Sequence, residues 1–273
     1  MTEIFSAYLD AAWEAADAAG RIICASWQKP KTVDYKGVID LVTDTDRQCE
    51  HAIVEVLTQR FPHHSILAEE ETRLQRHESP YRWIVDPLDG TTNFAHGYPH
   101  FCVSIALERA NEVILGLVYD PLRGECFRAF KDHGATLNGQ TIRCSAVDDL
   151  ERALLATGFP YDRRDHADYY LSYFKAFLTC CQGIRRNGAA ALDLCYVACG
   201  RIDGYWELKL KPWDVAAGSL IVAEAGGTLS DFRGRRFDIY GMETLAANAL
   251  IHEQMTRIAG AIETERVDWS PTR

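Results

Sequence analysis

Hydrophobic residues recur along the first 60 positions with the spacing of α-helices. Between residues 3 and 26 an apolar side chain returns every three or four positions, at Ile4, Tyr8, Ala11, Ala12, Ala15, Ala19 and Ile22. This period places them on one face of an amphipathic helix. A second helix is predicted from about residue 44 to residue 60, and its apolar positions are Ile53, Val56 and Leu57.

Shorter apolar runs bounded by turn residues predict strands at 65–68, 82–86, 102–108, 113–119 and 125–130. From about residue 148 strands at 154–158, 183–185 and 203–207 alternate with helices at 165–180, 189–199, 213–225 and about 249–262. Such alternation is typical of layered α/β proteins. We therefore expect two parts, residues 1–148 and 149–273. The polar tail, residues 263–273, is expected to be disordered.

Composition narrows the classes of function. The chain has 273 residues, 47% of them hydrophobic, which suffices for a substantial core. It shows neither an apolar stretch of membrane-spanning length nor a secretory signal, so we expect a cytoplasmic protein without a membrane partner. Nine cysteines without metal-binding spacing indicate reduced thiols. The formal net charge of −10 argues against nucleic-acid binding, but a bound cation can still admit a phosphorylated ligand.

The segment that says most about chemistry is residues 83–93, Trp-Ile-Val-Asp-Pro-Leu-Asp-Gly-Thr-Thr-Asn. Its apolar run leads into Asp86 and Asp89. Two carboxylates about 4 Å apart repel by about 4 kcal/mol at an effective dielectric near 20, so the pair needs a cation or a shared proton. Mg²⁺ suits such oxygen ligands, and a helix beginning at the Gly-Thr-Thr turn would direct N–H groups at an anion. An ordinary Asp-Pro and Asp-Gly turn is the alternative interpretation of this segment alone.

Two further acidic segments add to the pair. Glu69 and Glu70 follow the predicted strand at 65–68, and Asp214 lies in the first turn of the helix predicted at 213–225. Taken singly, the glutamates are typical of a solvated face and the aspartate of a helix cap. Converging with Asp86 and Asp89, Glu69 and Asp214 would form a cluster of four carboxylates with a formal charge near −4, which two or three Mg²⁺ ions would turn into a template for phosphate.

Together these segments resemble the inositol monophosphatase family, a branch of the Mg²⁺-dependent, Li⁺-sensitive sugar phosphatases. The first family signature is similar to residues 83–93, and the second is similar to residues 213–218 running on to 224–227. Residues 44–46, 134–139 and 186–191 also match, and the resemblance extends from about residue 4 to residue 255. It implies a five-layer αβαβα sandwich with an antiparallel N-terminal sheet, a smaller mixed C-terminal sheet, a metal site between them, and a homodimer. The Arg185-Arg186 pair resembles the bacterial branch.

The resemblance also implies a role for each site residue. Glu69, Asp86 and the Leu88 carbonyl would hold a first Mg²⁺. Asp86, Asp89 and Asp214 would hold a second, and Glu69 would face a third through water. Thr91, paired with Asp46, would hydrogen-bond the attacking water, which Glu69 and Glu70 would orient and deprotonate. The implied substrate contacts are Asp89, Gly90, Thr91, Ala190 and Glu207, and for Glu207 a solvated strand end is the alternative.

The expected reaction is hydrolysis of inositol 1-phosphate, or of related polyol and sugar monophosphates, by in-line attack of metal-activated water. Histidinol phosphatase, fructose-1,6-bisphosphatase and nucleotide 3′-phosphatase activities use the same chemistry and remain alternatives. Binding to the transcription machinery is a further alternative from a different class, for which the Arg185-Arg186 pair would matter. Arg163 and Arg164 are candidates for contact with a second charged group of a substrate, and solvent exposure is their default interpretation.

Overall fold

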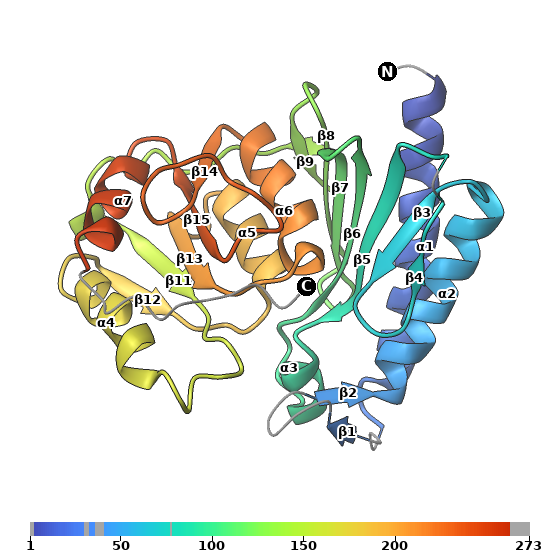
Figure 1. Ribbon diagram of the computed structural model, residues 1–273, viewed down its shortest axis with the longest axis horizontal. Helices are drawn as coiled ribbons and strands as arrows, with labels where there is room; N and C mark the ends of the chain where they lie inside the picture. The colour runs from blue at the N-terminus through green and yellow to red at the C-terminus, as the bar shows by residue number, and fades with distance from the viewer. Residues whose placement is uncertain (1–2, 30–32, 36–40, 77, 263–273) are drawn as a thin grey trace.

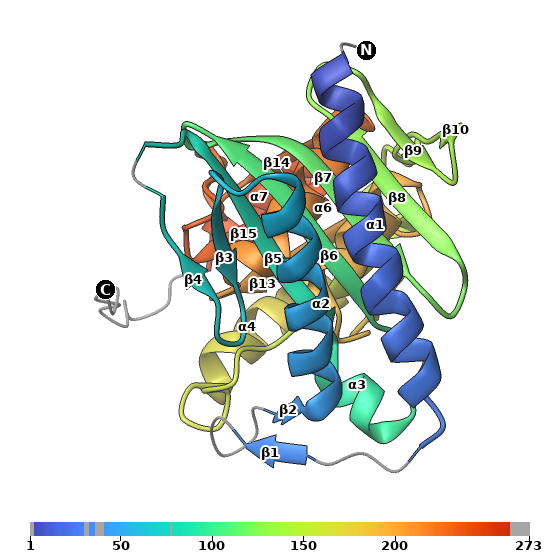
Figure 2. The same cartoon turned by 90° about the vertical axis from the view of Figure 1, so that its right-hand side faces the viewer.

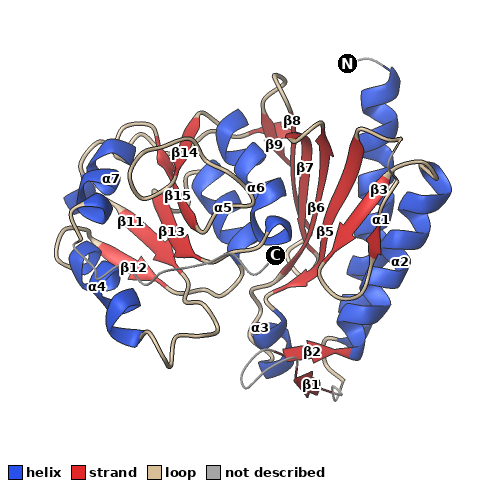
Figure 3. Ribbon diagram, viewed as in Figure 1, coloured by secondary structure: helices blue, strands red, loops and turns tan. Residues whose placement is uncertain are grey.

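A computed structural model describes residues 3–29, 33–35, 41–76 and 78–262, so the tail predicted to be disordered lies outside the described residues. Two sheets alternate with three layers of helices, giving the expected five-layer αβαβα sandwich (Figures 1 and 3). Within the described residues, no helix is both long and apolar enough to cross a membrane. All nine cysteines are free thiols.

The first layer consists of α1 (Glu3–Ser26) and α2 (Asp44–Arg60), which lie side by side across one face of the larger sheet (Figure 2). The alanines that recur along α1 are fully buried, and their small side chains let the helix pack closely. The start of α2 is fixed by a capping box, in which Thr43 and Asp46 satisfy free N–H groups of the first turn. Both helices have the bounds that the sequence predicts.

The larger sheet has eight strands in the order β10-β9-β8-β7-β6-β5-β3-β4. Their bounds are β3 (Ser65–Ala68), β4 (Arg73–Leu74), β5 (Tyr81–Asp89), β6 (Cys102–Arg109), β7 (Glu112–Asp120), β8 (Glu125–Phe130), β9 (Ala135–Leu137) and β10 (Gln140–Thr141). The expectation of a wholly antiparallel sheet is wrong for one pair, because β3 and β5 run parallel. The short β4 pairs with β3 at the edge of the sheet. The chain then returns to form β5 on the other side of β3. A separate ribbon of β1 (Val33–Tyr35) and β2 (Leu41–Thr43) precedes α2.

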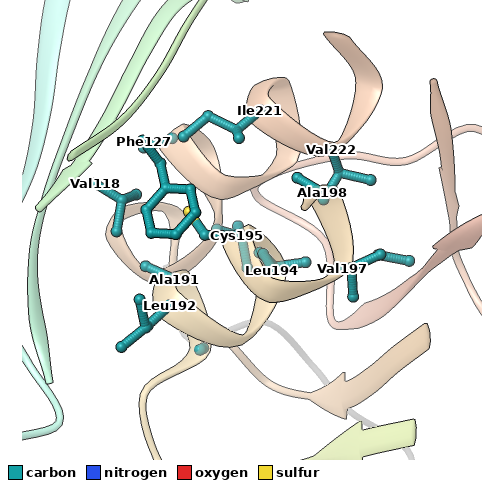
Figure 4. Close-up of a cluster of buried hydrophobic side chains, with 14 of the residues drawn as sticks. Val118, Phe127, Ala191, Leu192, Leu194, Cys195, Val197, Ala198, Ile221 and Val222 are labelled. Carbon is teal, nitrogen blue, oxygen red and sulfur yellow. The ribbon is translucent and has the colours of Figure 1, made fainter. Parts of the chain in front are cut away.

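The central layer consists of α5 (Ala190–Ala198) and α6 (Pro212–Glu224), which lie between the two sheets (Figure 1). Both helices are buried almost all round, as expected for helices covered on two faces. Gly116 of β7 permits the closest approach, since a Cβ there would lie 2.5 Å from the carbonyl oxygen of Ala217. Figure 4 shows side chains of this core meeting from four elements: Val118 of β7, Phe127 of β8, Cys195 of α5 and Ile221 of α6.

The smaller sheet has five strands in the order β12-β11-β13-β15-β14. Their bounds are β11 (Leu154–Thr157), β12 (Gly183–Arg185), β13 (Gly204–Leu208), β14 (Gly227–Ser230) and β15 (Glu243–Asn248). Because β11 pairs in parallel with β12 and β13 while the other pairs are antiparallel, the expected mixed sheet is confirmed. The outer layer contains α4 (Ala167–Leu178) and α7 (His252–Gly260), both shorter than predicted. The remaining helices are α3 (Thr91–His96) and the 3₁₀ helix Leu150–Arg152.

Candidate active site

The parallel pairing of β3 and β5 brings the first two acidic residues together. Ala68 lies opposite Val85 in the register, and the backbone N–H of Glu69 donates to the Val85 carbonyl at 3.1 Å. Since the strands run in the same direction, Glu69 and Asp86 emerge at the same edge of the sheet. The proximity of Glu69 and Asp86 therefore depends on the parallel pairing of β3 and β5, which the expectation of an antiparallel sheet did not include.

An irregularity in β5 adds Asp89 to the same edge. Asp86 pairs with Ser104 and Asp89 with Cys102, so β5 has one residue more than β6 over this interval. Residues three apart face opposite sides of a regular strand, and bulges commonly redirect side chains next to active sites. The Leu88 N–H donates to Asp86 Oδ1 at 3.0 Å across the irregularity. The strand predicted to end at Asp86 therefore continues to Asp89, with both carboxylates on one cavity.

Helices of the central layer supply the opposite wall. Asp214 is the third residue of α6, and its Oδ2 accepts from the Lys211 N–H at 2.6 Å. Asp89 Oδ2 accepts from the Ala191 N–H at 2.7 Å, in the first turn of α5. Both carboxylates thus lie where free N–H groups and the helix dipole favour negative charge.

A cavity of about 640 Å³ lies between these walls. Most of the residues assigned from the sequence line it: Glu69, Asp86, Leu88, Asp89, Gly90, Thr91, Ala190, Glu207 and Asp214. Asp46 and Glu70 are not among the lining residues. Asp46 is fully buried behind Thr91, whose hydroxyl donates to Asp46 Oδ1 at 2.8 Å.

Burial and mutual repulsion dominate the electrostatics of the cluster. The pKa of Asp86 lies well above its usual value because of burial, and then because of the charges of Glu69, Asp89 and Asp214. The pKa of Asp89 is likewise raised, by burial and then by Asp214. A cation among these oxygens would favour their ionised forms.

The donors fit a hard divalent cation. They are all oxygens, and a backbone N–H fixes one carboxylate oxygen of each of Asp86, Asp89 and Asp214. Among the described residues, no three His, Cys, Asp or Glu side chains stand close enough to enclose an ion by themselves. Hard divalent cations also use backbone carbonyls and retain water.

Glu207 is a half-buried residue that lines the cavity. It lies against Gly158, where a Cβ would come within 2.0 Å of Glu207 Oε2. The Tyr205 hydroxyl donates to the same carboxyl. Burial raises the pKa of Glu207 to about 7, although the hydrogen bond from Tyr205 and the charge of Arg186 oppose that rise.

The sequence interpretation missed Glu50, one helical turn after Asp46 in α2. Its buried carboxylate accepts three successive backbone N–H groups, from Glu70 at 2.8 Å, Glu71 at 2.9 Å and Thr72 at 2.7 Å. One face of α2 thus holds both the loop that follows Glu69 and, through Asp46, Thr91. Helical spacing offered a signal, because residues 46, 50, 53 and 57 share the apolar face of this helix.

Comparisons with known proteins identify the family. The model of the inositol monophosphatase family matches residues 6–265. An inositol-1-monophosphatase of Synechocystis sp. is 46% identical over 255 residues, which cover 93% of this chain and 89% of the relative. The Nus factor SuhB of Escherichia coli strain K12 is 43% identical over 228 residues, which cover 83% of this chain and 85% of the relative. The solved inositol monophosphatase of Anabaena (Nostoc) sp. has a TM-score of 0.87 at 41% identity and covers 96% of this chain and 98% of its own.

The stretch that the family model matches contains both sheets and the residues that line the cavity. The family is metal-dependent, in agreement with the oxygen donors found here. The chain belongs to the inositol monophosphatase family and is a phosphatase that hydrolyses phosphomonoesters.

Proposed function

We propose that this phosphatase uses two or three Mg²⁺ ions to hydrolyse inositol 1-phosphate and related polyol or sugar monophosphates. The observation that carries the proposal is the convergence of Glu69, Asp86, Asp89 and Asp214 on one cavity. The name of the Synechocystis relative supports the inositol substrate. A lithium-sensitive homodimer in the cytoplasm belongs to the same proposal, and nine free thiols agree with a reducing compartment.

The carboxylates divide between the ions in this proposal. Glu69, Asp86 and the Leu88 carbonyl would hold the first, while Asp86, Asp89 and Asp214 would hold the second. Glu69 would face a third ion. When bound, such cations lower the pKa of water and offset negative charge on the phosphate oxygens.

Thr91 orients the attacking water. Its hydroxyl donates its one proton to Asp46 Oδ1, which lies 2.8 Å from the hydroxyl oxygen. The Leu88 carbonyl oxygen lies 3.1 Å from the same hydroxyl oxygen. The lone pairs of the Thr91 oxygen therefore remain to accept a hydrogen bond from water. Glu69, helped by Glu70, receives the proton of that water. Asp46 is held in turn by the Thr43 N–H at 2.9 Å, which keeps the pair in place.

The start of α3 receives the phosphate. Gly90 has a φ of 92°, in the left-handed region, and a Cβ there would lie 3.0 Å from the His100 carbonyl oxygen. Glycine therefore lets this turn pack closely against the segment at His100, and the Gly90 and Thr91 N–H groups bind phosphate oxygens. Ala190 and Glu207 contact the hydroxyl-bearing part of the substrate.

Phosphate release from inositol 1-phosphate tests the proposal. We expect turnover with Mg²⁺ and its loss in excess EDTA, because the carboxylate cluster repels phosphate when no cation is bound. Full activity in excess EDTA would refute the metal assignment. Histidinol phosphate and a nucleotide 3′-phosphate serve as comparison substrates, and a higher kcat/KM for either would refute the substrate assignment.

A further inference from the structure

Four polar residues form a closed ring of contacts behind the cavity wall, and none of them has a part in the proposed hydrolysis. Asn93 of α3 and His100 before β6 belong to the N-terminal half, while Asn187 before α5 and Asp193 within α5 belong to the C-terminal half. His100 and Asp193 are buried, and none of the four lines the cavity. Buried polar groups are costly unless they are paired, so a reason for the ring at this place is required.

Asn93 joins the two halves with its side-chain amide. Its Nδ2 donates to the His100 carbonyl at 2.7 Å and to the Asn187 carbonyl at 2.8 Å. An amide nitrogen has two N–H donors. Because both partners are acceptors, the nitrogen and not the oxygen of the amide must face them, and both of its N–H groups are used.

Asp193 closes the ring from the other side. Its Oδ1 accepts from Asn187 Nδ2 at 2.7 Å and lies 3.4 Å from His100 Nε2. Each of the four residues thus contacts two of the others. Such contacts act as one network, in which the loss of one member loosens the rest.

One side of the ring fixes the turn before α3. Asn93 follows Thr91 by two residues in the same helix. The His100 carbonyl oxygen, which accepts from Asn93, would lie 3.0 Å from a Cβ at Gly90. The ring therefore holds the backbone on both sides of Thr91, whose hydroxyl orients the attacking water in the proposed mechanism.

The other side of the ring fixes the start of α5. Asn187 lies four residues before Ala191, whose N–H donates to Asp89 Oδ2 at 2.7 Å. Between them Gly188 lines the cavity, and a Cβ there would lie 3.2 Å from Asn93 Nδ2, so the amide packs directly against the cavity wall. The ring thus connects the N–H group that orients Asp89 with the turn that contains Asp89.

We propose that Asn93, Asn187 and Asp193 are positioning residues, which join the two halves of the chain so that Asp89 and Thr91 keep one geometry relative to each other. The inference rests on the proposed function, since that function gives Asp89 and Thr91 their roles. A displacement of about 1 Å at an active site can cost about 100-fold in rate, so a network that prevents it serves the reaction directly.

Asn93→Ala tests the ring, and Asn248→Ala is the matched control. The Nδ2 of Asn248 also donates twice, to Ser145 Oγ at 2.8 Å and to the Val147 carbonyl at 2.9 Å, but Asn248 does not line the cavity. We expect both variants to unfold at a lower denaturant concentration than the unaltered chain. Only Asn93→Ala should lower kcat, by at least about tenfold, with KM changed less than about threefold, because the misplaced groups act in the transition state.

Stabilisation by Mg²⁺ in the absence of substrate is the second readout. A cation that binds the folded chain raises the denaturant midpoint by mass action. This rise should be smaller in Asn93→Ala than in the unaltered chain, since Asp89 is a ligand of the second ion in the proposed function. In Asn248→Ala the rise should equal that of the unaltered chain.

Asn187→Ala tests whether the contacts act as one network. It removes the donor to Asp193 but keeps the backbone carbonyl that accepts from Asn93. We expect a lower kcat, and a kcat for the double variant with Asn93→Ala within about threefold of the lower single value. If Asn93→Ala does not fold, Asn187→Ala is compared with Asn248→Ala by the same two readouts.

The inference is wrong if Asn93→Ala keeps the kcat of Asn248→Ala, if its Mg²⁺-induced rise equals that of the unaltered chain, or if the two losses in kcat multiply in the double variant. Failure of the proposed function would look different, as absence of Mg²⁺-dependent phosphate release from inositol 1-phosphate by the unaltered chain.

Discussion

Replacing Glu207 by Gln should stabilise the fold increasingly as the pH rises. The carboxyl lies against Gly158 and accepts from the Tyr205 hydroxyl. Burial raises its pKa from 4.5 to about 7. Glutamine keeps the size of the side chain and an acceptor oxygen for Tyr205, but it cannot ionise. The substitution therefore removes the cost of a buried negative charge and leaves the packing in place.

The sign and size follow from proton linkage. The folded pKa lies above the unfolded pKa, so between pH 4.5 and about 7 the folded protein holds a proton that the unfolded chain has released. The stability contributed by Glu207 is thus complete below pH 4.5 and is lost as the pH rises through about 7. One pKa unit corresponds to about 1.4 kcal/mol, so the rise of the Glu207 pKa from 4.5 to about 7 costs the wild type about 3 kcal/mol.

Denaturant unfolding of the metal-free proteins, at several pH values from about 4.5 to about 8, measures this effect. The other titrating groups are common to both proteins, so they cancel in the difference in unfolding free energy. We expect little difference at the acid end and a gain for Glu207→Gln of up to about 3 kcal/mol above neutrality. Glu151→Gln, at an exposed position, is the matched control, and its difference in unfolding free energy from the wild type should not change with pH. If that difference for Glu207→Gln stays constant or falls as the pH rises, the reasoning is refuted.

Three further predictions concern the metal site. Asp89→Asn removes one ligand charge at nearly constant shape and should lower kcat by at least about 100-fold without loss of the unfolding transition; near-normal turnover would show that Asp89 is only a turn residue. Glu50→Gln places an amide N–H₂ against backbone N–H donors, so we expect a loss of about 1–3 kcal/mol in unfolding free energy and a higher Mg²⁺ concentration for half-maximal activity. An unchanged Mg²⁺ dependence would limit Glu50 to stability. Li⁺, a small hard cation suited to oxygen ligands, should inhibit in an uncompetitive or mixed manner, and more weakly in Asp214→Asn. Steady-state rates that show purely competitive inhibition, or none at tens of millimolar Li⁺, would contradict the assignment of the second ion.

The sequence alone determined the elements whose periodicity is strong. The bounds of α1 and α2 follow from apolar side chains at helical spacing and, for α2, from the cap at Thr43. The acidic segments around Asp86 and Asp214 indicated metal chemistry because closely spaced carboxylates at the ends of apolar elements need a cation. The two signature segments then identified the family and the five layers.

The tertiary structure decided what local patterns do not encode. The sequence interpretation omitted β15, whose segment Glu243–Asn248 shows no alternation; it is a strand because β13 and β14 pair with it on both sides. The parallel β3–β5 pair and the irregularity at Asp86 and Asp89 depend on which strands become neighbours.

The supporting residues of the site depend on the same long-range contacts. Glu50 is an ordinary helical glutamate until the loop of residues 70–72 packs against it. Asn93 is an ordinary asparagine after a Gly-Thr-Thr turn until the carbonyls of His100 and Asn187 accept its two N–H groups. Periodicity reports the face that each element buries, whereas a site is formed by contacts between elements far apart in the chain, which no local window contains.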